Sequence, residues 1–240
     1  MVKIAIIGFG KMGKTIKNIA EERGHSVCCI FDIDNPFTET TKVDADVAIE
    51  FTTPEMAKPN ILHAAKIGLP IVVGTTGWYD DFEEICDHIH KTGGSLFYAT
   101  NFSVGVNMFF KLNEALSRLM NKDHSYKASM EEIHHTEKKD APSGTAITLA
   151  EGLIAHHSNI ESWNLKGEGT ASSNSLPIDA KRIENVPGTH SITFGNSIDE
   201  ITISHVAHNR LGFATGAVLA AEWLPSHTGV HNMNDLLQLD

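Results

Sequence analysis

The sequence predicts an α/β protein with two domains, one a Rossmann-like parallel-sheet dinucleotide-binding domain and one an α+β domain with a mixed or antiparallel sheet. Three observations support this fold class. Short apolar runs alternate with helical segments up to residue 102, as in parallel strands joined by crossovers. The glycine-rich sequence GFGKMG directly follows the first apolar run. From residue 103 on, long helices and strands of period two replace this pattern.

The first domain is predicted from continuous apolar runs, which are typical of strands buried on both faces of a sheet. Strands are expected at 2–8, 26–32, 46–51, 70–74 and 95–99, and helices at 11–24, 54–68 and 79–93. The interval between Asp32 and residue 46 contains Pro36 and no apolar periodicity. We therefore expect no crossover helix there.

The second domain is predicted from amphipathic helices and alternating strands. Helices are expected at 104–120 and 144–157, strands at 126–135, 190–195 and 199–208, and a long polar loop at 159–180. A last helix, at 213–224, follows. The predicted domains are 1–102 together with 210–240, and 103–209, with hinges at the two changes of pattern.

The composition limits the partners. The chain has 240 residues, of which 41% are hydrophobic, and its net charge of −11 argues against a general affinity for nucleic acid or anionic membranes. No apolar run approaches the ~20 residues of a membrane helix. The three cysteines match no zinc spacing and fit a reducing compartment. Because structure begins almost at the first residue, we expect no signal peptide and a cytoplasmic protein.

The glycine motif predicts a dinucleotide site. Gly8 permits a tight turn, Gly10 lets a pyrophosphate approach the helix start, and Gly13 allows close packing of helix on strand. Asp32, at the end of the second strand, is placed to bind the adenosine ribose. A second acid, Asp34, follows and would repel a 2′-phosphate, which favours NAD over NADP. The alternative is a glycine turn without a ligand.

Three further polar loops follow predicted strand ends, where an open α/β sheet binds its ligands. They are FTTPE (51–55), GTTGW (74–78) and ATNFS (99–103). Their small polar residues suit contacts with ribose or nicotinamide. Ordinary connecting loops have a similar composition, so the prediction of ligand contacts rests on the shared position of these loops at strand ends.

The stretch EEIHHTEKKDAPSGTA, residues 131–146, predicts a site for a small polyanionic acid. A strand delivers His134 and His135 to its end, and Lys138 follows in the loop. Asp140 and Ser143 are candidate caps of the next helix, whose first N–H groups, at Gly144 and Thr145, favour a carboxylate. The stretch therefore combines anion binding with a proton donor.

Two alternatives remain for the paired histidines. They could bind a metal ion together with Glu131 or Glu137, although adjacent histidines rarely both ligate one metal. They could also be exposed loop residues. Our expectation is that no metal is bound.

The same stretch resembles the signature of the dihydrodipicolinate reductase family, also called 4-hydroxy-tetrahydrodipicolinate reductases. Similar stretches are GFGKMG, DVAIEFTTPE, VVGTTGW, ATNFSVGVN and VPGTHSITFG. The resemblance implies that His134 is the catalytic histidine and Lys138 the proton-donating lysine. It implies substrate binding by His135, Gly144 and Thr145. It places the cofactor contacts at Gly8, Phe9, Gly10, Lys11, Met12, Asp32, Gly74, Thr75, Thr76, Ala99, Thr100, Asn101 and Phe102.

The resemblance also implies a reaction and an assembly. The expected activity is reduction of a cyclic imine dicarboxylate in the diaminopimelate route to lysine, by a homotetramer joined through its second domains. Members of the family use NADH and NADPH, so we expect NADH as the preferred cofactor and NADPH as possible. The alternatives are another NAD-dependent dehydrogenase of this two-domain plan and a non-catalytic NAD sensor. A sensor would have no need of His134 and Lys138 beside a carboxylate site.

Overall fold

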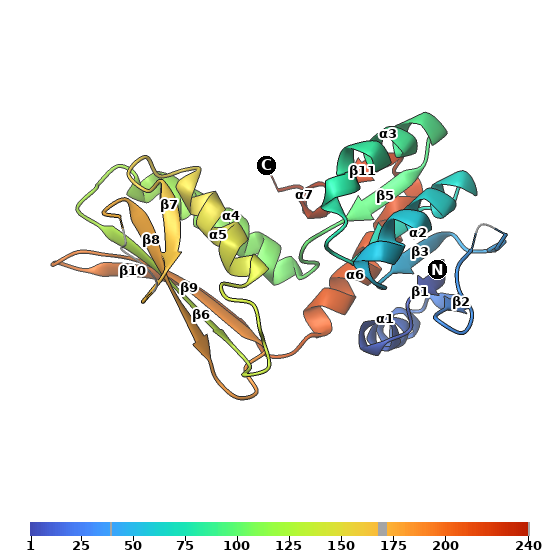
Figure 1. Cartoon of the computed structure of the whole chain (residues 1–240), viewed down its shortest axis with the longest axis horizontal. Helices are drawn as coiled ribbons and strands as arrows, with labels where there is room; N and C mark the ends of the chain where they lie inside the picture. Colours follow the sequence, from blue (N-terminus) through green and yellow to red (C-terminus); the bar gives the residue numbers. More distant parts are fainter. Residues whose placement is uncertain (39, 168–171, 240) are drawn as a thin grey trace. The chain divides into compact units, whose positions relative to one another are not determined.

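The computed structural model describes residues 1–38, 40–167 and 172–239. The chain divides into two compact units (Figure 1). Unit 1 comprises Met1–Val104 and Leu211–Asp240, and unit 2 comprises Gly105–Arg210. The α/β fold class, with one parallel sheet and one mixed sheet, is confirmed.

Unit 1 is built on a six-stranded sheet in the order β11-β5-β4-β3-β1-β2, in which every pair is parallel. Its strands are β1 (Lys3–Ile7), β2 (Ser26–Phe31), β3 (Val47–Glu50), β4 (Ile71–Val73), β5 (Ser95–Tyr98) and β11 (Gly229–His231). Its helices are α1 (Lys11–Glu22), α2 (Pro54–Lys66), α3 (Phe82–Thr92), α6 (Leu211–Trp223) and α7 (Met233–Leu237), with short 3₁₀ turns at Tyr79–Asp81 and Leu224–Ser226.

The sheet has apolar side chains on both faces, and each face supports its own core. On one face, Ile4, Ile6 and Ile49 pack against α1 and α6. On the other face, alternate residues of the same strands pack against α2 and α3. This double burial explains why the strands are continuous apolar runs instead of alternating ones.

Three details of unit 1 matter for the sequence predictions. The described residues between β2 and β3 form no helix, as expected. β2 was predicted to be buried on both faces, and this is wrong, because β2 is an edge strand with Cys28 exposed. β11 and α7 were not predicted, since a three-residue strand and a five-residue helix are too short to show a periodicity.

Unit 2 pairs two helices with a five-stranded mixed sheet in the order β10-β9-β6-β8-β7. The helices are α4 (Val104–Met120) and α5 (Gly144–Ile154), and the strands are β6 (Lys127–His134), β7 (Ser162–Leu165), β8 (Ser175–Arg182), β9 (Gly188–Gly195) and β10 (Glu200–Ala207). β6 is parallel to β8 and antiparallel to β9.

The two helices cover one face of this sheet (Figure 1). Phe109 of α4 and Leu149 of α5 pack against Met130, Ile178 and other buried strand residues. The opposite face carries exposed hydroxyl pairs, Ser191 with Ser204 and Thr193 with Thr202, each 2.8 Å apart between oxygens. One face of the sheet is therefore the core of unit 2, and the other is polar.

The predicted loop at 159–180 is wrong in two places, 162–165 and 175–180, which are strands. It contains β7 and most of β8, which pair with each other in parallel. Polar residues and Pro177 conceal the alternation of β8, in which Leu176 and Ile178 are buried. The part of the predicted loop at 168–171 lies outside the described residues. In the described part of the chain, no helix has the length and apolar character that crossing a membrane requires.

Candidate active site

The glycine-rich turn joins β1 to α1 and is closely packed at two glycines. Gly8 has a φ of 95°, which strains any residue with a side chain. A Cβ on Gly8 would lie 2.0 Å from the carbonyl oxygen of Phe51, and a Cβ on Gly13 would lie 2.1 Å from that of Gly8. Both positions therefore require glycine, and their packing fixes the start of α1 against the end of β1.

Gly10 differs from these two because it faces open space. It is the N-cap residue of α1, and a Cβ built on it would have no described atom within 4 Å beyond its immediate neighbours. The first N–H groups of a helix attract anions, and the space at Gly10 admits a phosphate close to the backbone. The turn therefore fits the pyrophosphate of a dinucleotide.

A cavity of about 370 Å³ includes this turn and the turns after β3 and β4. Its lining residues are Gly10, Lys11, Met12, Gly13, Phe51, Thr52, Pro54, Gly74, Thr75 and Thr76. The structure thus brings the glycine-rich turn together with the predicted contacts of the GTTGW loop. They meet at the carboxyl end of the parallel strands, where open α/β sheets bind their ligands.

A buried carboxyl group connects two of these turns. Glu50, the last residue of β3, is fully buried and accepts hydrogen bonds from the N–H and hydroxyl groups of Thr52 and from Asn60. The Thr52 N–H also lies 2.7 Å from Oγ of Thr75. Burial raises the pKa of Glu50. Glu50 was not predicted as a site residue, although an acid inside the apolar run DVAIEF was a visible signal.

The remaining predicted nucleotide contacts lie outside the lining of this cavity. Asp32 is exposed beyond β2, and its Oδ1 accepts the N–H groups of Asp34 and Asn35, each at 3.0 Å. Phe9 packs on the core under α1 and α6, and Lys14 Nζ lies 5.9 Å from its ring centroid. Asp32 therefore keeps an accessible carboxylate, while the Phe9 side chain belongs to the fold.

The loop after β5 is mostly buried. Ala99, Asn101 and Phe102 are at most 8% exposed, and Thr100 is exposed. The Phe102 ring lies 5.8 Å from the ring of Phe97 between centroids, so its side chain is part of the core. A ligand at Phe102 would meet backbone atoms.

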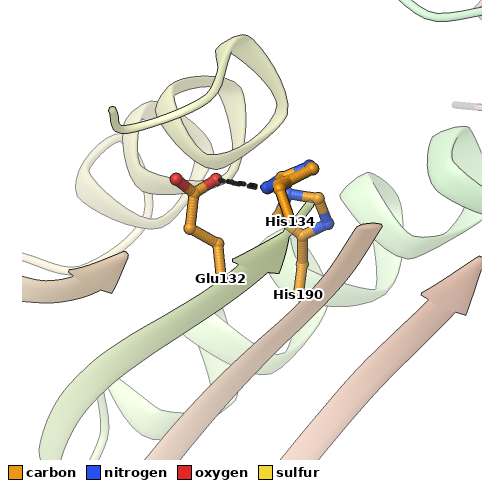
Figure 2. Close-up of side chains that lie close together, drawn as sticks. All are labelled: Glu132, His134 and His190. Carbon is orange, nitrogen blue, oxygen red and sulfur yellow. Dashed lines mark ion pairs between the residues drawn. The ribbon is translucent and has the colours of Figure 1, made fainter. Parts of the chain in front are cut away.

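In unit 2, strand β6 places an acid and a histidine on its helix-covered face. Glu132 is fully buried and His134 is 8% exposed. Glu132 lies directly across from His190 on β9, and the rings of His134 and His190 are 5.1 Å apart. Figure 2 shows Glu132 and His134 rising from one strand, with His190 beside them on the next. Glu132 and His190 were not predicted as site residues. The signal for Glu132 was its two-residue spacing from His134 on a strand.

Charge in this cluster is concentrated on Glu132. Burial alone would raise its pKa, but the His190 imidazole, 3.7 Å away, and the hydrogen bond from the Ser143 N–H outweigh burial and bring the pKa to about 2. Nδ1 of His134 lies 3.4 Å from Oε2 of Glu132, without the alignment of a hydrogen bond. Burial lowers the pKa of His134 to about 4 against the attraction of Glu132. At neutral pH the pair is therefore a carboxylate beside a neutral imidazole.

The start of α5 is anchored on the same carboxylate. The Ser143 N–H lies 3.1 Å from both oxygens of Glu132, and Oγ of Ser143 accepts the N–H of Ala146 at 3.1 Å. The prediction of Ser143 as a helix cap is therefore confirmed. Gly144 follows, and it is exposed with open space around it. Thr145 is half-buried in the first turn.

Lys138 and His135, the two other basic residues of the predicted site, each contact a protein group. Asp140, predicted as a cap, does not cap α5 and instead pairs with the ammonium of Lys138 at 2.7 Å. Nε2 of His135 lies 3.1 Å from the guanidinium of Arg210. His134 and His135 are successive residues of an extended segment, so they occupy different surroundings.

Glu132, His134 and His190 are the candidate metal ligands among the described residues, and their ligand atoms lie within 4.8 Å of one another. This set differs from the alternative with Glu131 or Glu137. Glu131 pairs instead with Lys181. Because both oxygens of Glu132 accept the Ser143 N–H and His190 contacts the Ser143 hydroxyl, the cluster works as a hydrogen-bonded support for the start of α5.

A nucleotide-type cavity in a parallel-sheet unit, with an acid–imidazole–lysine group in a second unit, is the arrangement of a two-domain nicotinamide-dependent oxidoreductase. The family models of the N-terminal and C-terminal parts of dihydrodipicolinate reductase match residues 2–102 and 105–237. The chain belongs to the dihydrodipicolinate reductase family and is an NAD(P)H-dependent oxidoreductase.

Similar proteins agree on this family. A 4-hydroxy-tetrahydrodipicolinate reductase of Christiangramia forsetii is 44% identical over 98% of both chains. The protein of that name from Methanosarcina acetivorans is 33% identical over 100% of this chain and 90% of its own. The dipicolinate-bound dihydrodipicolinate reductase from Paenisporosarcina sp. TG-14 has a similar fold, with a TM-score of 0.77, 21% identity and 98% coverage of each chain.

Proposed function

We propose that this chain reduces 4-hydroxy-tetrahydrodipicolinate to tetrahydrodipicolinate with loss of water, in the diaminopimelate route of lysine biosynthesis. The observation that supports this proposal is that several groups of the predicted site lie around the Glu132 carboxylate. His134 and the start of α5 contact this carboxylate directly, and Lys138 lies in the turn between them. A neutral imidazole, an ammonium group and an open helix start suit a small ring that bears two carboxylates.

Carboxylate binding is assigned to the start of α5. Gly144 and Thr145 begin the helix, where N–H groups and the helix dipole favour an anion. Gly144 has room for a ligand to approach its backbone. His135, the first residue after β6, is proposed as a further substrate contact. Holding the diacid at two points fixes its ring for the reaction.

The proton step is assigned to Lys138 and His134. When bound, the reduced nicotinamide supplies a hydride to the conjugated ring, and the negative charge that develops there requires a proton. We propose that Lys138 Nζ delivers this proton. The pKa of His134 is low, so its imidazole is neutral at neutral pH and is a poor acid. His134 then orients the ring by hydrogen bonding. A placed proton donor contributes about 10²–10⁴-fold in rate.

The cofactor is assigned to unit 1, with NADH preferred and NADPH possible. The pyrophosphate is proposed to lie at Gly10–Met12, and the sugar and nicotinamide at Gly74–Thr76 and Ala99–Phe102, with Gly8 and Phe9 shaping the turn. The preference rests on Asp32 and Asp34, which are both exposed beyond β2. A 2′-phosphate at this position would face two carboxylates, whereas ribose hydroxyl groups can donate to Asp32.

We also propose that the chain acts in the cytoplasm as a homotetramer. The polar face of the unit 2 sheet, with its paired serine and threonine side chains, is the surface we assign to the contact between copies. Light scattering should then give a mass of four times the 26.2 kDa chain. A monomer mass at assay concentration would exclude this assembly.

The test is an assay of NADH absorbance with the diacid generated in place from pyruvate and aspartate semialdehyde by the condensing synthase. Wild type should oxidise NADH, and His134→Gln and Lys138→Met should each lose about 10²-fold or more in kcat. NADH affinity, measured by fluorescence, should stay within about twofold, because both residues lie in unit 2. Tight NADH binding by wild type with no turnover would instead support the sensor alternative.

A further inference from the structure

Arg182 is the last residue of β8 and lies beside His134, its pairing partner on β6. Its guanidinium makes contacts in two directions. Nε donates to the carbonyl of Lys138 at 3.3 Å, and one terminal nitrogen donates to the carbonyl of Asp140 at 2.6 Å. The same nitrogen lies 3.4 Å from Oε1 of Glu132. One side chain therefore joins the turn after β6 to the buried carboxylate.

The two carbonyls belong to the turn that carries the Lys138 ammonium. Apart from its ends, this turn is exposed at Thr136, Glu137, Lys139 and Asp140, so little apolar packing holds it. A guanidinium has five N–H groups in one plane and can bind two carbonyls and a carboxylate at fixed angles. Arg182 thus supplies the rigid support that the turn lacks.

We propose that Arg182 is a positioning residue, which clamps the turn bearing Lys138 to Glu132 and so fixes the Lys138 ammonium relative to His134. This inference rests on the proposed function, because it assumes that these two groups act on the substrate. Arg182 itself need not touch the substrate, since its nitrogens are already directed at protein oxygens.

Glu132 is the buried carboxylate to which Arg182 connects the turn. Its oxygens receive the Ser143 N–H on one side and face Arg182 on the other. The carboxylate therefore ties together the start of α5 and the Lys138 turn, and it lies 3.4 Å from Nδ1 of the His134 imidazole. All three parts of the proposed substrate site share one buried reference point.

The test replaces Arg182 with alanine in the full-length protein. Displacing a reacting group by about 1 Å can cost about 10²-fold in rate, so we expect kcat to fall by about that factor. The NADH dissociation constant should not change, because the nucleotide cavity lies in unit 1. Added guanidinium chloride at low millimolar concentration should restore part of kcat, whereas sodium chloride at equal ionic strength should not.

Lys181→Ala is the matched control. Lys181 precedes Arg182 on β8, but its ammonium pairs with Glu131 and is 46% exposed. Its loss also removes one cation from the same strand. The kcat should stay within about twofold, because exposed ion pairs contribute little. A general loss of strand stability would reduce activity in both variants and would not respond to guanidinium.

The outcomes separate this inference from the proposed function. If His134→Gln and Lys138→Met lose activity while Arg182→Ala keeps the wild-type kcat, the positioning role is overturned and the function stands. If His134→Gln and Lys138→Met are both fully active, the proposed function fails first. Should Arg182→Ala not fold, Arg182→Lys keeps the charge without the planar fork. A folded Arg182→Lys protein with wild-type kcat would equally overturn the positioning role.

Discussion

The ammonium of Lys138 lies 2.8 Å and 2.7 Å from the two carboxylate oxygens of Asp140, two residues along the same turn. This ion pair lowers the pKa of Asp140. The Asp140 side chain is 60% exposed and that of Lys138 is 22% exposed, so water screens the pair. Breaking this ion pair therefore costs little free energy, and the ammonium can leave Asp140 to contact a substrate carboxylate or a ring atom.

The first prediction concerns this exchange. Asp140→Asn removes the charge and keeps the size of the side chain. Because an exposed ion pair is worth about 0–1 kcal/mol, kcat/KM for the diacid should change by less than about fivefold. Steady-state assays of Asp140→Asn and Lys138→Met side by side provide the check. An equally large loss in both variants would mean that the ion pair itself, and not the free ammonium, is required.

The second prediction is acid destabilisation through His134 and Glu132. The pKa of His134 is about 4 in the folded protein and 6.5 ordinarily, so the unfolded chain gains a proton first as the pH falls below 6.5. The pKa of Glu132 is about 2 against 4.5, so its stabilisation is complete above pH 4.5 and is lost towards pH 2. Both groups make the free energy of unfolding fall with falling pH.

Denaturant unfolding at pH 7.5 and pH 4.5 tests the His134 part. Over this interval, wild type should lose roughly 2–3 kcal/mol more than His134→Gln, which is the scale of two pKa units. Both proteins keep Glu132, so its small contribution near pH 4.5 cancels. An equal loss in the two proteins would show that His134 is not held neutral by burial.

The third prediction contrasts two glycines of one turn. Alanine at Gly13 should destabilise unit 1, because its Cβ would lie 2.1 Å from a backbone oxygen. Alanine at Gly10 should fold normally, because that position is open, but it should weaken NADH binding by about tenfold or more, equal to 1.4 kcal/mol. Thermal unfolding and NADH titration separate the two effects. An unchanged NADH affinity in Gly10→Ala would contradict the placement of the pyrophosphate at this turn.

The fourth prediction is a change of cofactor preference on Asp32→Asn. Asparagine keeps the oxygen that accepts the N–H groups of Asp34 and Asn35, but it removes one charge opposite the 2′-position. The ratio of kcat/KM for NADPH to that for NADH should rise by about fivefold, since like charges a few ångströms apart in water repel by about 1 kcal/mol. Parallel assays with the two cofactors measure the ratio, and an unchanged ratio would remove Asp32 from the ribose site.

Much of unit 1 followed from local pattern. The apolar runs that became β1, β3, β4 and β5 are unambiguous because both faces of the sheet are covered, and the glycine turn is confined by backbone contacts that no other residue permits. β2 was misjudged because an apolar run indicates burial but does not show that the strand lies at an edge. Short elements such as β11 form only through pairing with their neighbours, so no local sequence pattern predicts them.

The sequence by itself determined the fold class and the glycine-rich turn, and it predicts a site around His134 and Lys138, because each depends on residues close together in the chain. Only the tertiary structure decided which groups surround them. His190 and Arg182 reach Glu132 from β9 and β8, at least 50 residues away along the chain. Strand pairing sets such neighbours, and the registers of β6 with β8 and β9 can be specified only when the whole sheet of unit 2 closes on its helices.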